Sequence, residues 1–469
     1  MAVAPLVYVV VAAYLLGMLA LGLWAARARI ESADDFMVAG RRLPWFVIAA
    51  TLAATEVGGG SSMGVVAKAY GAWGLGAAWY IWAMALTFVV IALLAPRLIE
   101  SRVRTIPQYF EQRYDRPSAL VTASLMIVAL VGLTTVQTMA TGLLASTLLG
   151  IRYGSAALLS GAVVTLYTAF GGMWSVSLTD VAQWILIVVG MACALPFAIS
   201  RAGGVGRVAA ALPPAATDLF AKIGGAEIAS LLVIYTTSFS VGQEAMQRLY
   251  SAKSGGAARA GALTTAAFYL LFGALPPLLG LVASVLVKQG VIAQAALSRL
   301  GDGALLPLLA QSALPPLLCG LLFAGLISAT MSSADSNLLG AASIFTNDLW
   351  RRDAEPTRAL MQRTRAAVIA LGVLTTLLAA LEPRDLIDLL KLSFGLRAAG
   401  PFFPFVFGQL FSRGSRAGAL AALLGATALT LALAASKHAP WGLDPMLPGL
   451  ALGGALYFAG SLLRPDAAR

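Results

Sequence analysis

Two short stretches of this 469-residue sequence concentrate oxygen-bearing side chains within apolar surroundings. The first runs from Glu56 to Ser62 and contains three consecutive glycines. The second, from Ser328 to Asn337, carries hydroxyl, carboxylate and amide groups. Each glycine costs about 1 kcal/mol relative to alanine in a helix, so the first stretch predicts a break that frees backbone carbonyl groups. Because hard cations prefer oxygen ligands, the two stretches are typical of two halves of a sodium site.

The composition indicates that these stretches lie inside a membrane protein. Of the residues, 59% are hydrophobic and 11% are charged, and the mean hydropathy is +0.84. A soluble domain cannot bury that much apolar surface, because the surface of a folded chain shrinks too slowly with size. No stretch is long and polar enough for a separate soluble domain. We expect an all-α membrane protein with a single transmembrane transporter domain over residues 1–469.

Apolar runs bounded by charged residues, glycine or proline predict about 13 membrane-spanning helices, each of roughly 20 residues or more. We place them at residues 5–26, 44–67, 73–98, 118–149, 155–174, 178–199, 226–247, 261–287, 314–347, 365–382, 385–411, 416–436 and 446–463. The glycine run then falls in the second predicted span and the hydroxyl-rich stretch in the ninth.

Arginine residues gather in a few of the predicted loops. The groups are Arg27, Arg29, Arg41 and Arg42; Arg97, Arg102, Arg104, Arg113 and Arg116; and Arg351, Arg352, Arg358, Arg363 and Arg365. Short loops with such an excess lie in the cytoplasm. We therefore expect a bacterial inner-membrane protein with a periplasmic N-terminus and a cytoplasmic C-terminus. The net charge of +11 is attributed to this topology, and nucleic acid is not an expected partner.

Close packing of two helices through small residues is the alternative explanation of the glycine run. A broken helix is favoured because Glu56 stands beside the glycines at mid-span, and unwound backbone is tolerated in a bilayer only where it lines a cavity or is buried in protein. The ninth span is too polar to face lipid, so we expect it to face the interior of the bundle.

No group of side chains is typical of an enzyme or of a zinc site. The two cysteines, Cys193 and Cys319, fall in apolar stretches, and the one histidine, His438, lies in a polar connector. These residues form no nucleophile–base pair and no tetrahedral ligand set. We therefore expect no enzymatic activity and no cofactor, with Na⁺ as the coupling ion.

Several motifs along the chain resemble those of the sodium:solute symporter family, which includes proline, sugar and choline symporters. The segment from Gly150 to Ser175 matches the family's signature, and Thr179 to Gln183 continues it. Further matches lie at residues 35–45, 105–110, 247–254, 332–336 and 345–349. The resemblance covers nearly the whole chain, and the number and order of the motifs carry it.

This resemblance implies a LeuT-like fold, in which five spans are followed by five others related by a pseudo-two-fold axis in the membrane plane. The inverted repeats would occupy about residues 44–199 and 226–411. The family's main sodium site maps to backbone oxygens of Ala54, Val57 and Ala329 and to the hydroxyls of Ser332 and Ser333. Asp180 stands where relatives have a second sodium-interacting carboxylate. Because it opens the sixth predicted span, an N-cap is the equal alternative.

Departures from these relatives leave the identity of the solute open. Sugar symporters have Asn at the position of Glu56, and proline symporters have Asp. The sugar-binding Gln and Glu of the sugar symporters correspond to Ser61 and Ile81 here, which argues against a sugar. Choline transporters have an aromatic residue before the glycines, where this chain has Glu56.

Polar and charged residues inside the spans are candidates for solute contact, because such residues are costly in a bilayer and usually functional. Arg397 could pair with Glu56 or Asp335, or bind a carboxylate of the solute. Three threonines share a face of the fourth span beside Gln137, which indicates a cavity wall. The candidates for solute binding or coupling are Glu56, Gly58, Gly59, Ser61, Gln137, Gln243, Asp335 and Arg397, and Glu244 raises the same question as Gln243.

The sequence therefore predicts a secondary transporter that couples sodium to the uptake of a small polar organic solute, such as a carboxylate or an amino acid. Its partners would be the ion, the solute and the lipid bilayer. Three roles stay open for Glu56: counter-ion of Arg397, contact to sodium or to a cationic group of the solute, and proton carrier. One alternative is thus a proton-coupled symporter. Another is a membrane sensor without net transport, against which we count the lack of a kinase domain after Arg464.

Overall fold

The computed structural model describes residues 4–464 and 466, except for 351–356, 382–385 and 437–442. The predicted connector around His438 and the arginines at 351 and 352 lie outside these residues. Over the described part, the protein consists of helices without any β-strand, and one isolated bridge pairs Leu43 with Ala252. The prediction of an all-α protein is confirmed.

The helices of the first half are α1 (Pro5–Arg29), α2 (Ala33–Val38), α3 (Trp45–Glu56), α4 (Val65–Lys68), α5 (Ala78–Glu100), α6 (Ile106–Arg113), α7 (Arg116–Leu149), α8 (Tyr153–Arg201), α9 (Val205–Ala211), α10 (Pro214–Thr217), α11 (Gly225–Ser240) and α12 (Gln243–Tyr250). Those of the second half are α13 (Gly255–Phe272), α14 (Leu275–Lys288), α15 (Gln294–Leu300), α16 (Leu305–Ala313), α17 (Pro316–Ile344), α18 (Thr357–Leu381), α19 (Leu386–Ala398), α20 (Phe402–Gly408), α21 (Arg416–Ser436) and α22 (Met446–Leu463). Short 3₁₀ or π-helical turns are η1 (Ala39–Arg41), η2 (Gly60–Gly64), η3 (Ala69–Trp73), η4 (Gly74–Ala77), η5 (Asp302–Ala304) and η6 (Phe345–Leu349).

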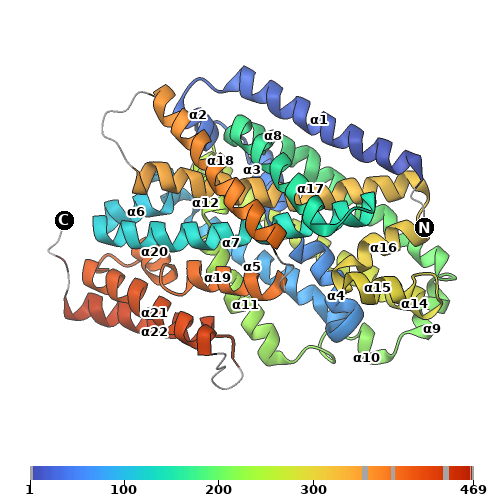
Figure 1. The fold of residues 1–469 in the computed structure, drawn as a ribbon. Coiled ribbons are helices and arrows are strands. Elements are labelled where there is room, and N and C mark those ends of the chain that lie inside the picture. The colour runs from blue at the N-terminus through green and yellow to red at the C-terminus, as the bar shows by residue number, and fades with distance from the viewer. Residues whose placement is uncertain (1–3, 351–356, 382–385, 437–442, 465, 467–469) are drawn as a thin grey trace.

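The long helices run side by side along one direction of the molecule (Figure 1). Helix α1 begins at the end shown at right, which also holds α9, α10 and α14 to α16, whereas α22 ends at the opposite end, near α6 and α20. In the described residues, nine helical segments are long and apolar enough to cross a membrane, or ten if the bent pair α11 and α12 is one span. Two of these segments each cover two of the predicted spans at least in part, so the total of 13 stays a prediction.

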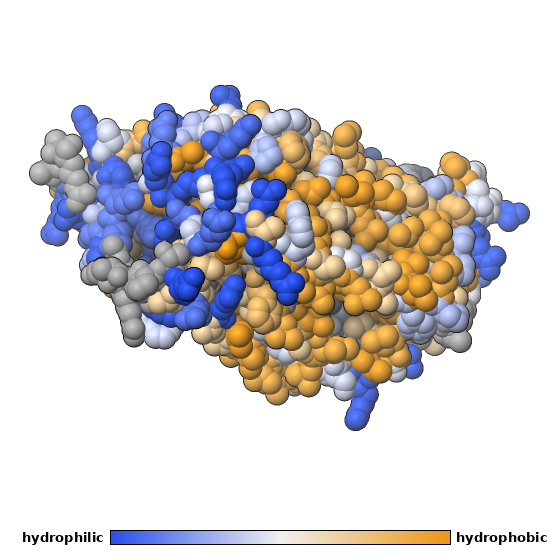
Figure 2. Space-filling view, turned by 90° about the horizontal axis from the view of Figure 1, so that it is seen from above, coloured by the Kyte–Doolittle hydropathy of each residue, from blue (hydrophilic) through white to orange (hydrophobic). Residues whose placement is uncertain are grey.

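Apolar side chains cover the middle of the surface, and hydrophilic residues gather mainly at the end that holds α2 and α6 (Figure 2). Large apolar side chains within the long helices are strongly exposed, as at Leu16 (66%), Leu93 (62%) and Leu166 (56%). Exposed apolar surface of this extent is expected where helices face hydrocarbon instead of water. The protein is thus a multi-pass membrane protein.

Two spans are interrupted near their middles. Helix α3 ends at Glu56, Val57 has non-helical angles (φ −82°, ψ 72°), and helical structure resumes with the π-helical turn η2 at Gly60. Helices α11 and α12 are bent by 50° where they meet at Val241 and Gly242. The break predicted at the glycine run is confirmed, whereas no residue-level prediction was made for the second break.

The glycine run also permits close packing of helices. A Cβ atom on Gly59 would lie 2.8 Å from the Cβ of Ala140 in α7, closer than such atoms approach in proteins. Gly59 itself has ordinary helical angles (φ −58°, ψ −33°). Both explanations of the run therefore hold, because the chain leaves the helix at Val57 and the following glycines let α7 approach the break.

Helix α8 covers two predicted spans and is kinked at Gly172 (φ 56°, ψ −170°). The predicted boundary at residues 175–177 was therefore a few residues late. Asp180 lies about two turns beyond the kink, inside the helix, where the backbone amides already have helical partners. The alternative that Asp180 is an N-cap was therefore wrong.

Candidate functional site

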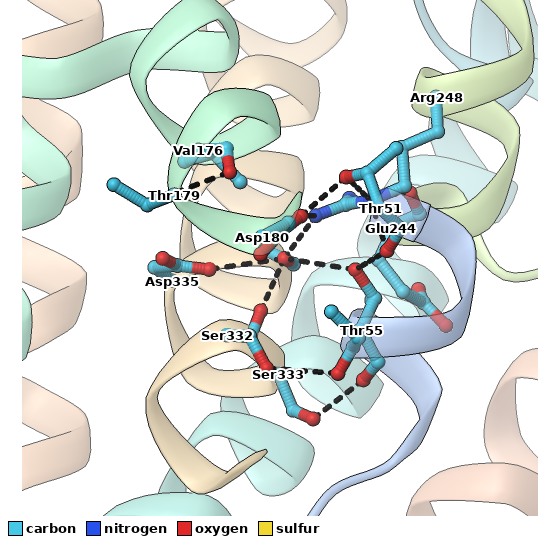
Figure 3. A network of polar contacts seen from close by, with 12 residues as sticks. Thr51, Thr55, Val176, Thr179, Asp180, Glu244, Arg248, Ser332, Ser333 and Asp335 are labelled. Carbon is cyan, nitrogen blue, oxygen red and sulfur yellow. Dashed lines mark hydrogen bonds and ion pairs between the residues drawn. The ribbon is translucent and has the colours of Figure 1, made fainter. Parts of the chain in front are cut away.

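The middle of α17 contacts the end of α3 through two serine hydroxyls (Figure 3). Ser332 Oγ donates a hydrogen bond to the carbonyl oxygen of Ala54 at 2.8 Å and lies 3.1 Å from that of Ala329. Ser333 Oγ donates to the carbonyl oxygen of Thr55 and lies 3.1 Å from the oxygen of Ala329. Four of the five predicted sodium ligands therefore lie together in the protein interior, and they are hydroxyl or carbonyl oxygens of the kind that a hard cation prefers.

The fifth predicted ligand, Val57, follows directly on α3. Its non-helical backbone begins the unwound segment, and its amide still bonds to the carbonyl oxygen of Ala53 at 3.2 Å. The carbonyl groups at the end of a helix have no partner within that helix. At the break, the carbonyl oxygens of Ala54 and Thr55 thus accept hydrogen bonds from the two serine hydroxyls.

A small cavity lies beside this contact, at the break in α3. It has a volume of about 30 Å³, which is room for roughly two water molecules. Five of the predicted solute candidates line it, namely Glu56, Gly58, Ser61, Gln137 and Arg397. Further lining residues include Tyr80, Phe239, Glu244, Asn337 and Phe394. The predicted cavity wall on α7 is present at Gln137, whose Oε1 accepts a hydrogen bond from the Gly59 amide at 2.9 Å.

Arg397 forms an ion pair at this cavity, but its partner differs from those predicted. Its Nη1 pairs with Oε1 of Glu244, and its Nε donates to Ser238 Oγ at 2.7 Å. The guanidinium lies over the rings of Phe239 and Phe394, 4.8 and 5.0 Å from their centroids. The expected pairing with Glu56 or Asp335 was therefore wrong, although the expectation of a buried carboxylate partner was right.

A second polar cluster lies further along α17 and joins it to α3, α8 and α12 (Figure 3). Asp180 Oδ2 pairs with Arg248 Nη2 at 2.8 Å, and both side chains are fully buried. Arg248 also donates from Nε to Thr51 Oγ1 at 2.8 Å and from Nη1 to the carbonyl oxygen of Glu244 at 2.9 Å. Within the described structure, Oδ1 of Asp180 and Oδ2 of Asp335 have no hydrogen-bond partner.

Three predicted solute candidates, Gly59, Gln243 and Asp335, do not line the cavity. Asp335 lies in the Asp180 cluster, where its Oδ1 accepts a hydrogen bond from Ser336 at 3.0 Å. Gln243 instead ties α12 to the segment before α6, because its side chain bonds the amide of Ile106 at 2.9 Å and the carbonyl oxygen of Arg104 at 3.1 Å. Gln243 therefore holds two segments together in this conformation.

Arg248 is a site residue to which no role was assigned from the sequence, and Glu244 was considered only alongside Gln243, without a predicted partner. Gly242 lies two residues before Glu244, so a glycine and a carboxylate occur together inside a predicted span, as they do at Glu56. A Cβ atom on Gly242 would lie 2.5 Å from Glu244 Oε1 and 3.2 Å from Arg397 Nη1. The same signal that located the first break was thus present at the second.

Comparison with known sequences agrees with the resemblance. A sequence model of the sodium:solute symporter family matches residues 36–425. The chain is 29% identical to a sodium/glucose cotransporter of Vibrio parahaemolyticus, with 74% of this chain and 69% of that protein covered. It is 28% identical to an osmoregulated proline transporter of Bacillus subtilis, with 94% of this chain and 91% of that protein covered.

The fold is similar to that of a solved transporter. A structure of a Na⁺-coupled sialic acid symporter in a substrate-bound, outward-open state superimposes with a TM-score of 0.83. The superposition covers 99% of this chain and 100% of the other, at 20% sequence identity. This similarity confirms the predicted LeuT-like fold.

Proposed function

The chain belongs to the sodium:solute symporter family, and we propose that it uses a sodium gradient to take up a small polar organic solute. The observation that carries the proposal is the contact of the Ser332 and Ser333 hydroxyls with carbonyl oxygens at the break in α3. These groups come from two different helices and converge where the backbone is unwound. Half-helix ends of this kind serve as ion sites in transporters.

Sodium would bind by replacing hydrogen bonds that are already present. The serine hydroxyls now donate to carbonyl oxygens. A cation would turn both hydroxyl oxygens and the carbonyl oxygens of Ala54, Val57 and Ala329 toward itself. Because the ligands belong to α3 and α17, the bound ion would hold these helices together. An ion that binds one arrangement more tightly than the other shifts the equilibrium toward that arrangement.

Solute coupling follows from the position of the cavity. Ser333 and Thr55 line it and also take part in the hydroxyl–carbonyl contact. Sodium and solute would therefore stabilise the same closed arrangement of α3 and α17. Coupling of this type is reciprocal, so the solute must raise the affinity for sodium by the same factor by which sodium raises the affinity for the solute.

The Asp180 cluster is a candidate second coupling site. Its two carboxylates, Asp180 and Asp335, face one guanidinium, that of Arg248, which leaves one negative charge without a counter-charge. One oxygen of each carboxylate is free of partners in the described structure. Buried uncompensated charge is costly, so a second cation would be stabilised here.

Arginines of the short segments around α2 and α6 lie at one end of the molecule, whose surface is hydrophilic (Figure 2). Their excess supports a cytoplasmic location for this end. Arginines there also close this end of the bundle. Arg41 Nη2 donates to the carbonyl oxygen of Arg102 at 2.8 Å, and Arg104 Nε pairs with Asp34 at 2.7 Å. With this end inside the cell, α1 begins outside and α22 ends inside, so the N-terminal end is periplasmic and the C-terminal end cytoplasmic.

Uptake of labelled solutes into proteoliposomes tests the proposal. We expect a solute to accumulate only under an inward sodium gradient and to leak out when an ionophore dissipates that gradient. Accumulation driven by a pH gradient without sodium would support a proton-coupled symporter instead. Sodium-dependent binding without accumulation in sealed vesicles would support a sensor. The relatives are named for glucose and for proline, so the first panel contains sugars and amino acids.

A further inference from the structure

We propose that the cavity at the break in α3 recognises a zwitterionic solute, a small amino acid or a close analogue. The carboxylate of the solute would bind the free guanidinium nitrogen of Arg397, and its amino group would bind Glu56. The inference rests on the proposed transport function, because it names the class of solute that the symporter carries.

Buried polar atoms without partners are the first support. In the described structure, Glu56 Oε1, Glu244 Oε2 and Asn337 Oδ1 accept no hydrogen bond, and Arg397 Nη2 donates none. All four residues line the same cavity, and each is at least nine-tenths buried, with exposures of 1 to 8%. Leaving such groups unsatisfied is costly. A ligand that satisfies them must present donors and an acceptor together.

The guanidinium of Arg397 is held so that one nitrogen remains for a ligand. Its Nη1 pairs with Glu244 and its Nε donates a hydrogen bond to Ser238, while two aromatic rings flank the group. Arginine binds carboxylates more strongly than it binds neutral acceptors, because the hydrogen bonds are charge-assisted. Glu244 is therefore a positioning residue that orients Arg397, and Nη2 is the atom left for the carboxylate of the solute.

The acceptors in the cavity match an ammonium group. Three free oxygens from Glu56, Glu244 and Asn337 line it, and a primary ammonium group has three N–H donors and no acceptor. A purely anionic solute would leave these oxygens unsatisfied and add a third negative charge. A cation without a carboxylate would leave Arg397 Nη2 without a partner.

Charge balance also favours a solute without net charge. Two carboxylates and one guanidinium line the cavity and give a net charge of −1 at their ordinary ionisation states. A sodium ion at the adjacent serines brings the sum to zero. A zwitterion keeps that sum, whereas a net charge on the solute would be buried without compensation, which costs several kcal/mol by general experience with buried ions.

Sugars also lack a net charge, but they fit these walls less well. Their hydroxyls carry no charge of their own, so they would lack the attraction between opposite charges that the ammonium group and the carboxylate of a zwitterion add at Glu56 and Arg397. The cavity volume of about 30 Å³ corresponds to roughly two water molecules, so the surrounding helices must move apart to admit a solute of either kind.

Ligand-dependent thermal stabilisation of the purified protein tests the inference in NaCl and in KCl of equal ionic strength. The panel contains the genetically encoded amino acids, β-alanine and γ-aminobutyrate, with glucose, propionate and choline as representatives of the other charge classes. We expect at least one zwitterion to stabilise the protein in NaCl. Its analogues without the amino group or without the carboxylate should need concentrations at least about ten-fold higher, because each lacks a hydrogen bond to a charged group.

Two variants connect the result to the cavity. Glu56→Gln should raise the half-saturating concentration of the zwitterion by about ten-fold or more and should change that of its deaminated analogue much less. Arg397→Lys should weaken the binding of the analogue that keeps only the carboxylate more than the binding of the analogue that keeps only the amino group. Glu227→Gln, which changes an exposed carboxylate in the first turn of α11, is the matched control and should leave both concentrations unchanged.

The outcomes separate this inference from the proposed function. Tighter binding of glucose, propionate or choline than of every zwitterion would overturn the solute class. Stabilisation of the protein by sodium but by no zwitterion would overturn it too. Sodium-independent binding of a zwitterion would leave the solute class standing and contradict sodium coupling. If Arg397→Lys does not fold, the analogue series on the unmodified protein still decides the question.

Discussion

The side chains of Arg397 and Glu244 form an ion pair in the interior, although 153 positions separate them in the sequence. The pair joins α19 to α12, the second half of an interrupted span. Both side chains are nearly inaccessible, with exposures of 2 and 3%. A contact of this kind stabilises the bundle only while both charges are present, because removal of one leaves the other buried alone.

Glu244→Gln should therefore destabilise the protein by about 3–5 kcal/mol, the usual cost of breaking a buried pair. The free energy of unfolding in detergent, measured with denaturant, checks this value. The double variant with Arg397→Gln should lose less stability than the two single changes added together, because the partners interact directly. Additive losses would show that the two charges do not depend on each other.

The pair of Asp180 and Arg248 should resemble the pair of Glu244 and Arg397 in its effect on stability. It differs because Asp180 is also a candidate sodium contact. Asp180→Asn and Arg248→Gln should each destabilise the protein by about 3–5 kcal/mol, and the double variant should recover part of that loss. If Asp180 also contacts a second sodium ion, Asp180→Asn should additionally raise the sodium concentration for half-maximal uptake, and the double variant should not restore it. Unchanged sodium dependence in Asp180→Asn would restrict this residue to its ion pair.

The local features of the site could be predicted from the sequence because they depend on neighbouring residues. The glycines after Glu56 predicted the break in α3, and the hydroxyl-rich stretch predicted that α17 is buried. Ser332 and Ser333 were placed by resemblance, and the structure brings their hydroxyls to the carbonyl groups at that break.

Contacts between distant helices could not be predicted in this way. Hydropathy places Arg397 inside a span but does not say which helix it faces, so the prediction named Glu56 or Asp335 and missed Glu244. The helix boundary before Asp180 was misplaced because the kink depends on one residue, Gly172, in a stretch without charged residues. The partner of Asp180, Arg248, comes from α12, beyond a break that the sequence analysis did not predict.

The close approach of Gly59 to Ala140 predicts that a destabilising change at Gly59 is partly compensated by a second change at Ala140. Gly59→Ala should destabilise the protein by about 1–3 kcal/mol, the usual cost of overpacking, because the new methyl group would lie 2.8 Å from the Cβ of Ala140. Adding Ala140→Gly removes the opposing methyl group and should restore part of the stability, which thermal unfolding in detergent would measure. No recovery in the double variant would show that Gly59 is needed for a reason other than this contact.

The membrane orientation predicts which side of the membrane each loop faces. With Cys193 and Cys319 replaced, a cysteine at Ser412, near α20, should react with a membrane-impermeant maleimide only after the cytoplasmic side is opened. A cysteine at Asp218, near α10, should react in intact cells. Both positions are exposed. The predicted loop at residues 350–358 lies mostly outside the described residues, so Ser412 replaces it as the reporter. The reverse pattern of labelling would invert the topology.

The sodium site is tested most directly by removing its two hydroxyls. Ser332→Ala combined with Ser333→Ala should raise the sodium concentration for half-maximal uptake by about ten-fold or more, because two oxygen ligands are lost. Ser328→Ala is the matched control, since it removes a hydroxyl from the same helix that donates to the carbonyl oxygen of Ala324 at 2.8 Å. It should leave the sodium dependence unchanged. Because hydroxyls in a helix often bond only to their own backbone, the comparison separates a ligand from a helical hydrogen bond. A folded double variant with unchanged sodium dependence would contradict the site.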